Sequence, residues 1–145
     1  MAAAPHFEQV NVVVSDMDAA ADFYSVLGVE MNAPADAWPP GTGARHANPV
    51  DHETAGDFDL DNEEMARLWG HAGLHAGETV IGFSLATRDD VDETYQRLTA
   101  AGYTGRREPY DAFFGARYAV VEDPDGHPVG LMSPRDPERR SVPEP

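Results

Sequence analysis

Closely spaced carboxylates in the first half of the chain could bind a metal ion or a cationic ligand. The stretch Asp51–Glu64 holds seven acidic residues and no basic one. Within it, Asp57, Asp59 and Asp61 alternate with apolar residues, which predicts a strand with its acids on one face. A site for a metal or cation and a solvated strand face are both consistent with this pattern.

Four histidines near these carboxylates are further candidate ligands. His46 and His52 lie in or beside a segment rich in Pro and Gly, where a histidine is more often solvated than bound to a metal. His71 and His75 have the i, i+4 spacing of a zinc-binding pair, but the glycines between and after them disfavour the required helix. We therefore interpret this segment as a linker between two halves. Whether the four histidines build a non-standard metal site stays open.

The composition excludes several classes of function. The chain of 145 residues has no cysteine, so disulfides, thiolate metal sites and cysteine nucleophiles are excluded. It also has no lysine, which excludes Schiff-base chemistry. The formal net charge of −16 argues against binding nucleic acid through its phosphates, and fits either a cleft for a cationic ligand or a solubilising, salt-adapted surface. No membrane span or secretion signal is visible, so we expect a cytoplasmic protein.

The elements that must position these residues begin with a strand and a helix. Residues 7–14 alternate as a strand. Ser15 or Asp16 then caps a helix whose apolar stripe ends at Gly28. This order predicts a strand that runs directly into a helix lying against a sheet.

The second half of the chain repeats that order. Residues 78–87 are a predicted strand, and Asp89 or Asp90 is the predicted cap of a helix that ends at Gly102. An offset of 74 residues pairs Asp16 with Asp90 and Gly28 with Gly102. An internal repeat of this length predicts two similar modules.

A β-hairpin closes the second half. The strand Ala116–Val121 leads into the turn Asp123-Pro124-Asp125-Gly126, and the chain returns as the strand Val129–Met132. An Arg-Tyr strand running into Asp-Pro-Asp-Gly resembles the last hairpin of the vicinal oxygen chelate superfamily. The Asp-capped helix that ends in FYSVLG resembles the opening of a module of the same superfamily. That superfamily includes glyoxalase I, extradiol dioxygenases and bleomycin-resistance proteins.

The resemblance implies an α+β fold of two βαβββ modules that form a curved mixed sheet around a cavity. We expect the first module at residues 1–72 and the second at 73–133, together in one compact domain. Residues 134–145, rich in Pro and Arg, are expected to be a disordered tail or to lie on a partner. The resemblance also implies a homodimer.

The metal ligands of the superfamily are not reproduced at the positions that the resemblance implies. Seven residues before the first helix cap stands Gln9, an acceptable ligand, but the same distance before Asp90 stands Phe83. The last-strand position, normally Glu, is Gly130, and only Asp57 or Asp59 could add a carboxylate. Because Zn, Ni and Fe sites need three or four convergent donors, we expect no metal and no cofactor.

The remaining prediction is a small-molecule pocket. If their strands present one face inward, Gln9, Asn11, Val13, Phe83, Leu85 and Thr87 line it, with Phe113 and Phe114 at the rim. Arg117 could hold a ligand carboxylate, although a structural ion pair is the commoner role, and Trp38 could stack on a ligand or cover the core. The candidate ligand-binding residues are Gln9, Asn11, Trp38, Asp59, Phe83, Leu85, Phe113, Phe114 and Arg117.

Three hypotheses for function follow, and no residue is assigned a catalytic role. We favour a metal-free protein that sequesters an aromatic or cationic small molecule, similar to the bleomycin-resistance branch, whose run of an aromatic residue, Gly, any residue and Arg resembles residues 113–117. The alternative is a glyoxalase-like lyase or isomerase, or a dioxygenase, with a non-standard site. The third is a structural dimer whose cavity has collapsed.

Overall fold

The computed structural model describes residues 4–70 and 73–142 as a mixture of helices and strands that forms two compact units. The N-terminal module is Gln9–Thr79. The C-terminal module consists of the chain up to Glu8 together with the chain from Val80 onward. The repeat expected from the sequence is thus present, although the first residues of the first strand belong to the second module. No helix in the described ranges is long and apolar enough to cross a membrane.

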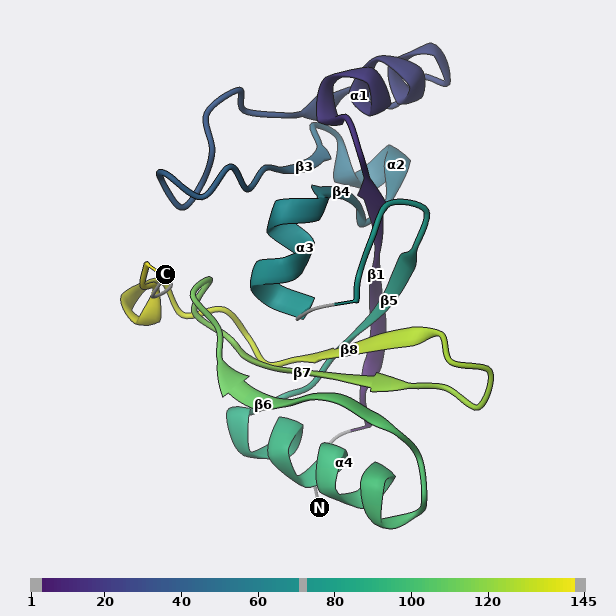
Figure 1. Ribbon diagram of the computed structural model, residues 1–145, viewed down its shortest axis with the longest axis vertical. Coiled ribbons are helices and arrows are strands. Elements are labelled where there is room, and N and C mark those ends of the chain that lie inside the picture. Colours follow the sequence, from purple (N-terminus) through teal and green to yellow (C-terminus); the bar gives the residue numbers. More distant parts are fainter. Residues whose placement is uncertain (1–3, 71–72, 143–145) are drawn as a thin grey trace. The chain divides into compact units, whose positions relative to one another are not determined.

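The N-terminal module is a four-stranded mixed sheet with the strand order β2-β3-β4-β1. β1 and β4 are parallel, whereas β3 is antiparallel to both β2 and β4. Helix α1 covers one face of the sheet, where Met17, Ala47 and Leu60 are buried (Figure 1). The elements are β1 (His6–Val14), α1 (Met17–Val26), β2 (Met31–Asn32), β3 (His46–Pro49), α2 (His52–Ala55), β4 (Phe58–Asn62) and α3 (Glu63–Gly70).

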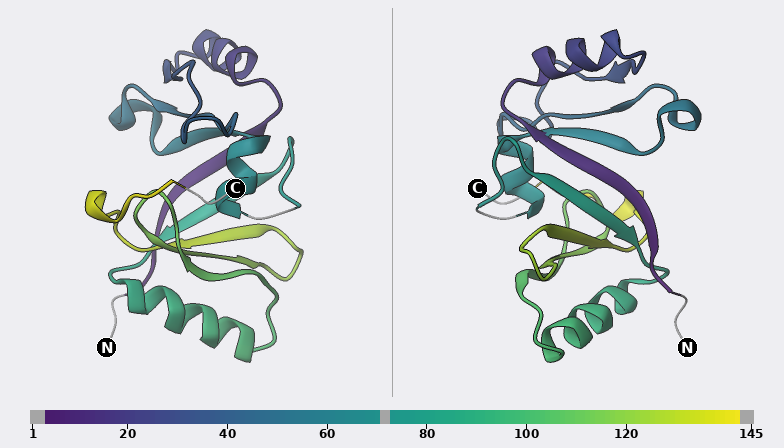
Figure 2. Two further views of the ribbon diagram at one scale, coloured as in Figure 1. Left: turned by 60° about the vertical axis from the view of Figure 1, so that its left-hand side comes forward. Right: turned by 90° about the vertical axis from the view of Figure 1, so that its right-hand side faces the viewer.

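The C-terminal module repeats the arrangement with the strand order β5-β8-β7-β6. β5 is parallel to β8, and β7 is antiparallel to both β6 and β8. Helix α4 lies along one face of this sheet, as two further views show (Figure 2). The elements are β5 (Thr79–Ser84), α4 (Arg88–Ala100), β6 (Gly105–Asp111), β7 (Arg117–Glu122), β8 (Pro128–Met132) and the short 3-10 helix Pro137–Arg139.

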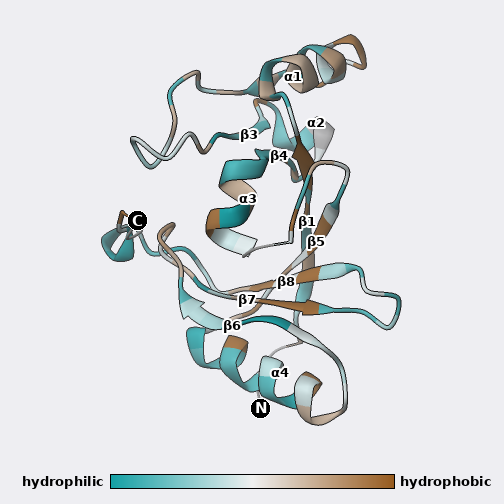
Figure 3. Ribbon diagram, viewed as in Figure 1, coloured by the Kyte–Doolittle hydropathy of each residue, from teal (hydrophilic) through white to brown (hydrophobic). Residues whose placement is uncertain are grey.

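The core of the C-terminal module lies between α4 and the sheet. Leu85, Val91, Ala119, Val121 and Leu131 are buried there. The apolar colour of the central parts of β7 and β8 marks the same strands (Figure 3). Each module therefore has the βαβββ order with its helix on one sheet face, which confirms the predicted α+β fold of two such modules.

The second helix starts earlier than the sequence pattern suggested. Its cap is Thr87, whose side chain accepts a hydrogen bond from the backbone N–H of Asp90, and not Asp89 or Asp90. Helix α4 has 13 residues against 10 in α1. The glycines after the two helices are 74 residues apart, but the caps Asp16 and Thr87 are only 71 apart.

The segment expected to be a disordered tail is packed on its own module as far as it is described. The backbone N–H of Asp136 donates to the carbonyl of Gly115 at 3.1 Å, and that of Ser141 donates to the carbonyl of Phe113 at 3.0 Å. Gly115 has a φ of +96°, and a Cβ there would overlap the carbonyl oxygen of Asp136. This close approach of two backbones explains why the position is glycine.

Candidate functional site

A row of polar side chains occupies the face of the N-terminal sheet opposite α1. β1 and β4 pair in the register Asn11 with Asp59 and Val13 with Asp61. Side chains alternate along a strand, so Leu60 enters the core under α1 while Asp59 and Asp61 point to the other face. The predicted strand of alternating acids is therefore correct in its faces, and its acidic face is largely buried rather than solvated.

These side chains form a continuous chain of contacts, which we call the Asp–His network: Gln9, Asn11, His46, Asp59 and Asp61. The amide of Gln9 donates to Asn11 at 2.9 Å, and the amide of Asn11 donates to Asp61 Oδ2 at 2.8 Å. The other oxygen of Asp61 lies 2.6 Å from His46 Nδ1. On the far side of the ring, His46 Nε2 lies 3.7 Å from Asp59 Oδ2.

The Asp–His network has an excess of negative charge. Asp61 is 1% exposed and Asp59 is 7% exposed, whereas the side chain of His46 is 36% exposed. Two carboxylates share one imidazole, so at least one negative charge stays uncompensated within these five residues when both acids are ionised. Buried carboxylates are stabilised by cations, which makes this the best place in the N-terminal module for a ligand's positive charge.

The nearby arginine does not neutralise this site. Both terminal nitrogens of Arg45 contact the carboxylate of Asp18, at 3.2 and 2.9 Å. Hydrogen bonding to Arg45 lowers the pKa of Asp18, and the same pairing raises the pKa of Arg45. The guanidinium is thus committed to another carboxylate.

The residues at the superfamily's metal positions do not fit a metal ion. Counting seven residues back from the true cap Thr87 leads to Val80, which is 1% exposed and apolar, in place of Phe83. At Gly130, a Cβ would overlap the hydroxyl of Tyr118, so that ring fills the space where a ligand side chain would stand. Two of the implied positions therefore offer no donor, as the sequence predicted.

The shift of the cap also changes the role of two predicted pocket residues. Leu85 is 4% exposed in the core under α4, and Phe83 packs against that core and meets the ring of Phe7 edge-on at 6.0 Å. The expectation that these two side chains face a pocket is therefore wrong. An offset that is too large by three residues, an odd number, assigns every strand residue to the opposite face.

Two other candidates form an aromatic row in the C-terminal module. Phe113 and Phe114 meet edge to face at 5.3 Å, and Phe114 meets Tyr118 at 5.6 Å. Tyr118 in turn lies 6.2 Å from Tyr110, and burial raises the pKa of Tyr110. The predicted rim aromatics are thus brought together, but Phe113 is 5% exposed and belongs to the packed interior.

The last two candidates lie outside the Asp–His network. Arg117 Nε donates to Asp92 at 2.8 Å and a terminal nitrogen donates to Asp111 at 3.2 Å, and these bonds raise the pKa of Arg117. The structural ion pair that we considered the commoner role is thus the arrangement present. Trp38 is 41% exposed in the loop between β2 and β3.

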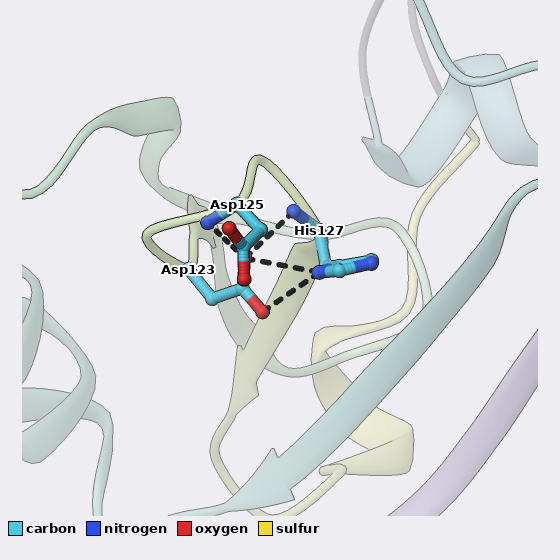
Figure 4. Close-up of side chains that lie close together, drawn as sticks. All are labelled: Asp123, Asp125 and His127. Carbon is cyan, nitrogen blue, oxygen red and sulfur yellow. Dashed lines mark hydrogen bonds and ion pairs between the residues drawn. The ribbon is translucent and has the colours of Figure 1, made fainter.

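One further cluster of potential ligands lies in the β7–β8 turn. In the described ranges, Asp123, Asp125 and His127 are a group of three ligating side chains within 4.8 Å of one another (Figure 4). The carboxylate of Asp123 already accepts the backbone N–H groups of Asp125 and His127, each at 2.9 Å, and its other oxygen lies 2.9 Å from His127 Nδ1. These bonds, chiefly that from the His127 backbone, lower the pKa of Asp123. The cluster is accounted for as the internal bonding of the turn.

The remaining histidines of the first half are separated from the Asp–His network by their own partners. His52 Nδ1 lies 3.2 Å from Asp57, and His75 Nε2 lies 4.0 Å from Glu78. His71 lies outside the described residues. The sequence reasoning missed His46 and Asp61 as site residues, although the strict alternation of Asp59 and Asp61 placed both acids on one face.

Comparison with known proteins supports the fold. A family model described as "Glyoxalase/Bleomycin resistance protein/Dioxygenase superfamily" matches residues 6–131. No curated protein sequence matches this chain significantly.

Similar solved structures share the fold at low sequence identity. A Mn(II)-bound glyoxalase from Novosphingobium aromaticivorans is 21% identical with a TM-score of 0.58, and the match covers 92% of this chain but only 40% of that one. A methylmalonyl-CoA epimerase from Mycobacterium tuberculosis is 19% identical with a TM-score of 0.53, covering 90% and 88%. A hypothetical protein from Bacillus halodurans is 14% identical with a TM-score of 0.61, covering 92% and 97%.

Proposed function

The chain belongs to the glyoxalase/bleomycin resistance protein/dioxygenase superfamily, and we propose that within it the protein binds a small molecule with a cationic group without using a metal ion. The observation that carries the proposal is the Asp–His network, in which two buried carboxylates share one half-exposed imidazole. The ligand's cation contacts Asp59, while Asp61 is held by Asn11 and His46. An apolar or aromatic body on the ligand would add affinity through burial.

The metal-free part of the proposal rests on the donor set. Val80 and Gly130 stand where the superfamily's implied ligands would be, and neither has a donor side chain. The first test is therefore the metal content of protein purified without chelators, followed by melting temperatures with added Zn, Ni, Mn and Fe. We expect no stoichiometric metal and no shift, because a metal that binds the native state must raise the melting temperature. Stoichiometric metal or a shift of several degrees would overturn this part.

Calorimetric titration with benzylamine tests the cation site, with benzyl alcohol as a neutral ligand of the same shape. We expect benzylamine to bind more tightly, and Asp59→Asn to weaken it by about tenfold because a charge-assisted contact is lost. Asp57→Asn is the matched control, since Asp57 stands two residues away with a side chain that is 48% exposed and paired with His52. Equal binding of the two ligands, or equal effects of the two substitutions, would contradict the proposal.

A proton-transfer enzyme is the second candidate function. It is favoured by the geometry of His46, whose Nδ1 is fixed by a buried carboxylate while Nε2 points away from it, the arrangement of an oriented general base. Two of the similar structures are described as a glyoxalase and an epimerase. Turnover of an α-proton substrate that His46→Gln abolishes, in protein that still binds benzylamine, would favour this candidate over a pure binding protein.

A further inference from the structure

A separate pocket lies entirely within the C-terminal module, and nothing in the proposed function uses it. It has a volume of about 350 Å³ between the start of β1, the end of β5 and the end of β8. Small-molecule sites are typically about 300–1,000 Å³, so this pocket is large enough for a ligand of amino-acid size. Its lining includes His6, Glu8, Ser84, Leu85, Met132 and Arg135.

The ionisable side chains of this pocket are unpaired. Within the described ranges, His6, Glu8 and Arg135 make no hydrogen bond or ion pair through their side chains. This is unusual for the arginine, because the chain has 26 acids against 10 basic residues, and Arg45, Arg88 and Arg117 each pair with an aspartate. A cation without an intramolecular partner in such an acidic protein is available to a ligand.

The chemistry of the lining is that of a receptor for a molecule with two opposite charges. Arg135 presents a planar fork of donors that matches a carboxylate, and His6 adds another potential donor. Glu8 offers the complementary carboxylate for an ammonium group, and the hydroxyl of Ser84 can accept or donate. Leu85 and Met132, both buried, provide an apolar floor for an aliphatic side chain.

We propose that this pocket binds a small zwitterion, a free amino acid with an aliphatic side chain, through Arg135 at its carboxylate and Glu8 at its ammonium group. The site lies in the other module from the Asp–His network, so it stands or falls independently of the proposed function. Ser133 supports it structurally: its hydroxyl accepts the backbone N–H of Arg117 at 2.8 Å and donates to the carbonyl of Pro134, which fixes the segment that carries Arg135.

Isothermal titration with L-leucine and two truncated analogues tests the proposal. Isoamylamine lacks the carboxylate of leucine, and isocaproate lacks its amine. We expect leucine to bind, and each analogue to bind at least about tenfold more weakly because one charge-assisted interaction is missing. No leucine binding, or equal binding of all three, would overturn the proposal.

Single substitutions assign the two charges. Arg135→Gln and Glu8→Gln should each weaken leucine binding by about tenfold, and both residues are exposed or half-buried, so the fold is retained. Arg139→Gln is the matched control, because Arg139 stands in the same segment but pairs with Asp136 outside the pocket lining. Asp59→Asn should leave leucine binding unchanged, which separates this site from the Asp–His network. If Arg135→Gln behaves like Arg139→Gln, the proposal is wrong.

Discussion

Asp61 is the residue on which the order of the Asp–His network depends. It is 1% exposed, and its two oxygens take the amide of Asn11 and the ring of His46 at 2.8 and 2.6 Å. Removing it would leave two buried or half-buried polar groups without their shared partner. The network should therefore be as much a determinant of stability as of binding.

We expect Asp61→Ala to lower the free energy of unfolding by about 3 kcal/mol, since breaking a buried charged pair leaves its partners uncompensated. Urea denaturation measures the loss. Asp57→Ala removes a half-exposed carboxylate from the same segment and should cost about 0.5 kcal/mol or less. Losses of similar size for both variants would show that the carboxylate of Asp61 is not paired as described.

Gly130 and Tyr118 should be coupled. A Cβ at position 130 would overlap the Tyr118 hydroxyl and lie 3.1 Å from the ring carbon that bears it. We expect Gly130→Ala to cost about 1–2 kcal/mol of unfolding free energy, because Tyr118 is 7% exposed and has little room to move. In a double-mutant cycle, the cost should be smaller in a Tyr118→Phe background, where the overlapping atom is gone. Strict additivity of the two changes would contradict the contact.

At the scale of elements, the fold was predictable and its exact register was not. Strand alternation, a capped helix and a turn of Asp-Pro-Asp-Gly predicted each βαβββ unit, because those signals are local. The cap of α4 was misplaced, since three acids or hydroxyls in a row, Thr87, Asp89 and Asp90, are all acceptable caps. Pairing the glycines at the helix ends hid the extra turn of α4, and the strand before it was then assigned the wrong face.

The cap assignment can be tested by substitution at Thr87. Thr87→Ala should lower the free energy of unfolding by about 1 kcal/mol, because the backbone N–H of Asp90 loses its partner. Thr87→Ser retains the hydroxyl and should restore most of the stability. Asp90→Asn, at the residue first expected to be the cap, should have the smaller effect of a charge in the first helical turn. A larger loss for Asp90→Asn than for Thr87→Ala would place the cap at Asp90 after all.

At the scale of the whole molecule, the homodimer remains a prediction from the resemblance. We expect light scattering coupled to size-exclusion chromatography to give twice the mass of one chain at micromolar concentration. The test needs moderate salt, because a net charge of −16 on each chain opposes association when screening is weak. A monomer mass that persists as the salt concentration rises would contradict the prediction.

The ligands could not be predicted from the sequence at any scale. The strand of alternating acids marked Asp59, but the partnership with His46 depends on a short strand in a segment rich in Pro and Gly, where periodicity is lost. Likewise Glu8 and Arg135 are 127 positions apart, and only the fold brings them to one pocket.

The path of β1 determines how this protein could be divided or recombined. Residues up to Glu8 belong to the C-terminal module, where Phe7 meets Phe83, while Gln9 onward belongs to the other module. A gene cut in the linker near residue 73 would therefore give a second fragment that lacks part of its own interior and both N-terminal residues of its pocket. An exchange of halves between relatives would have to transfer two separate stretches of DNA, or first join the ends of the chain by circular permutation.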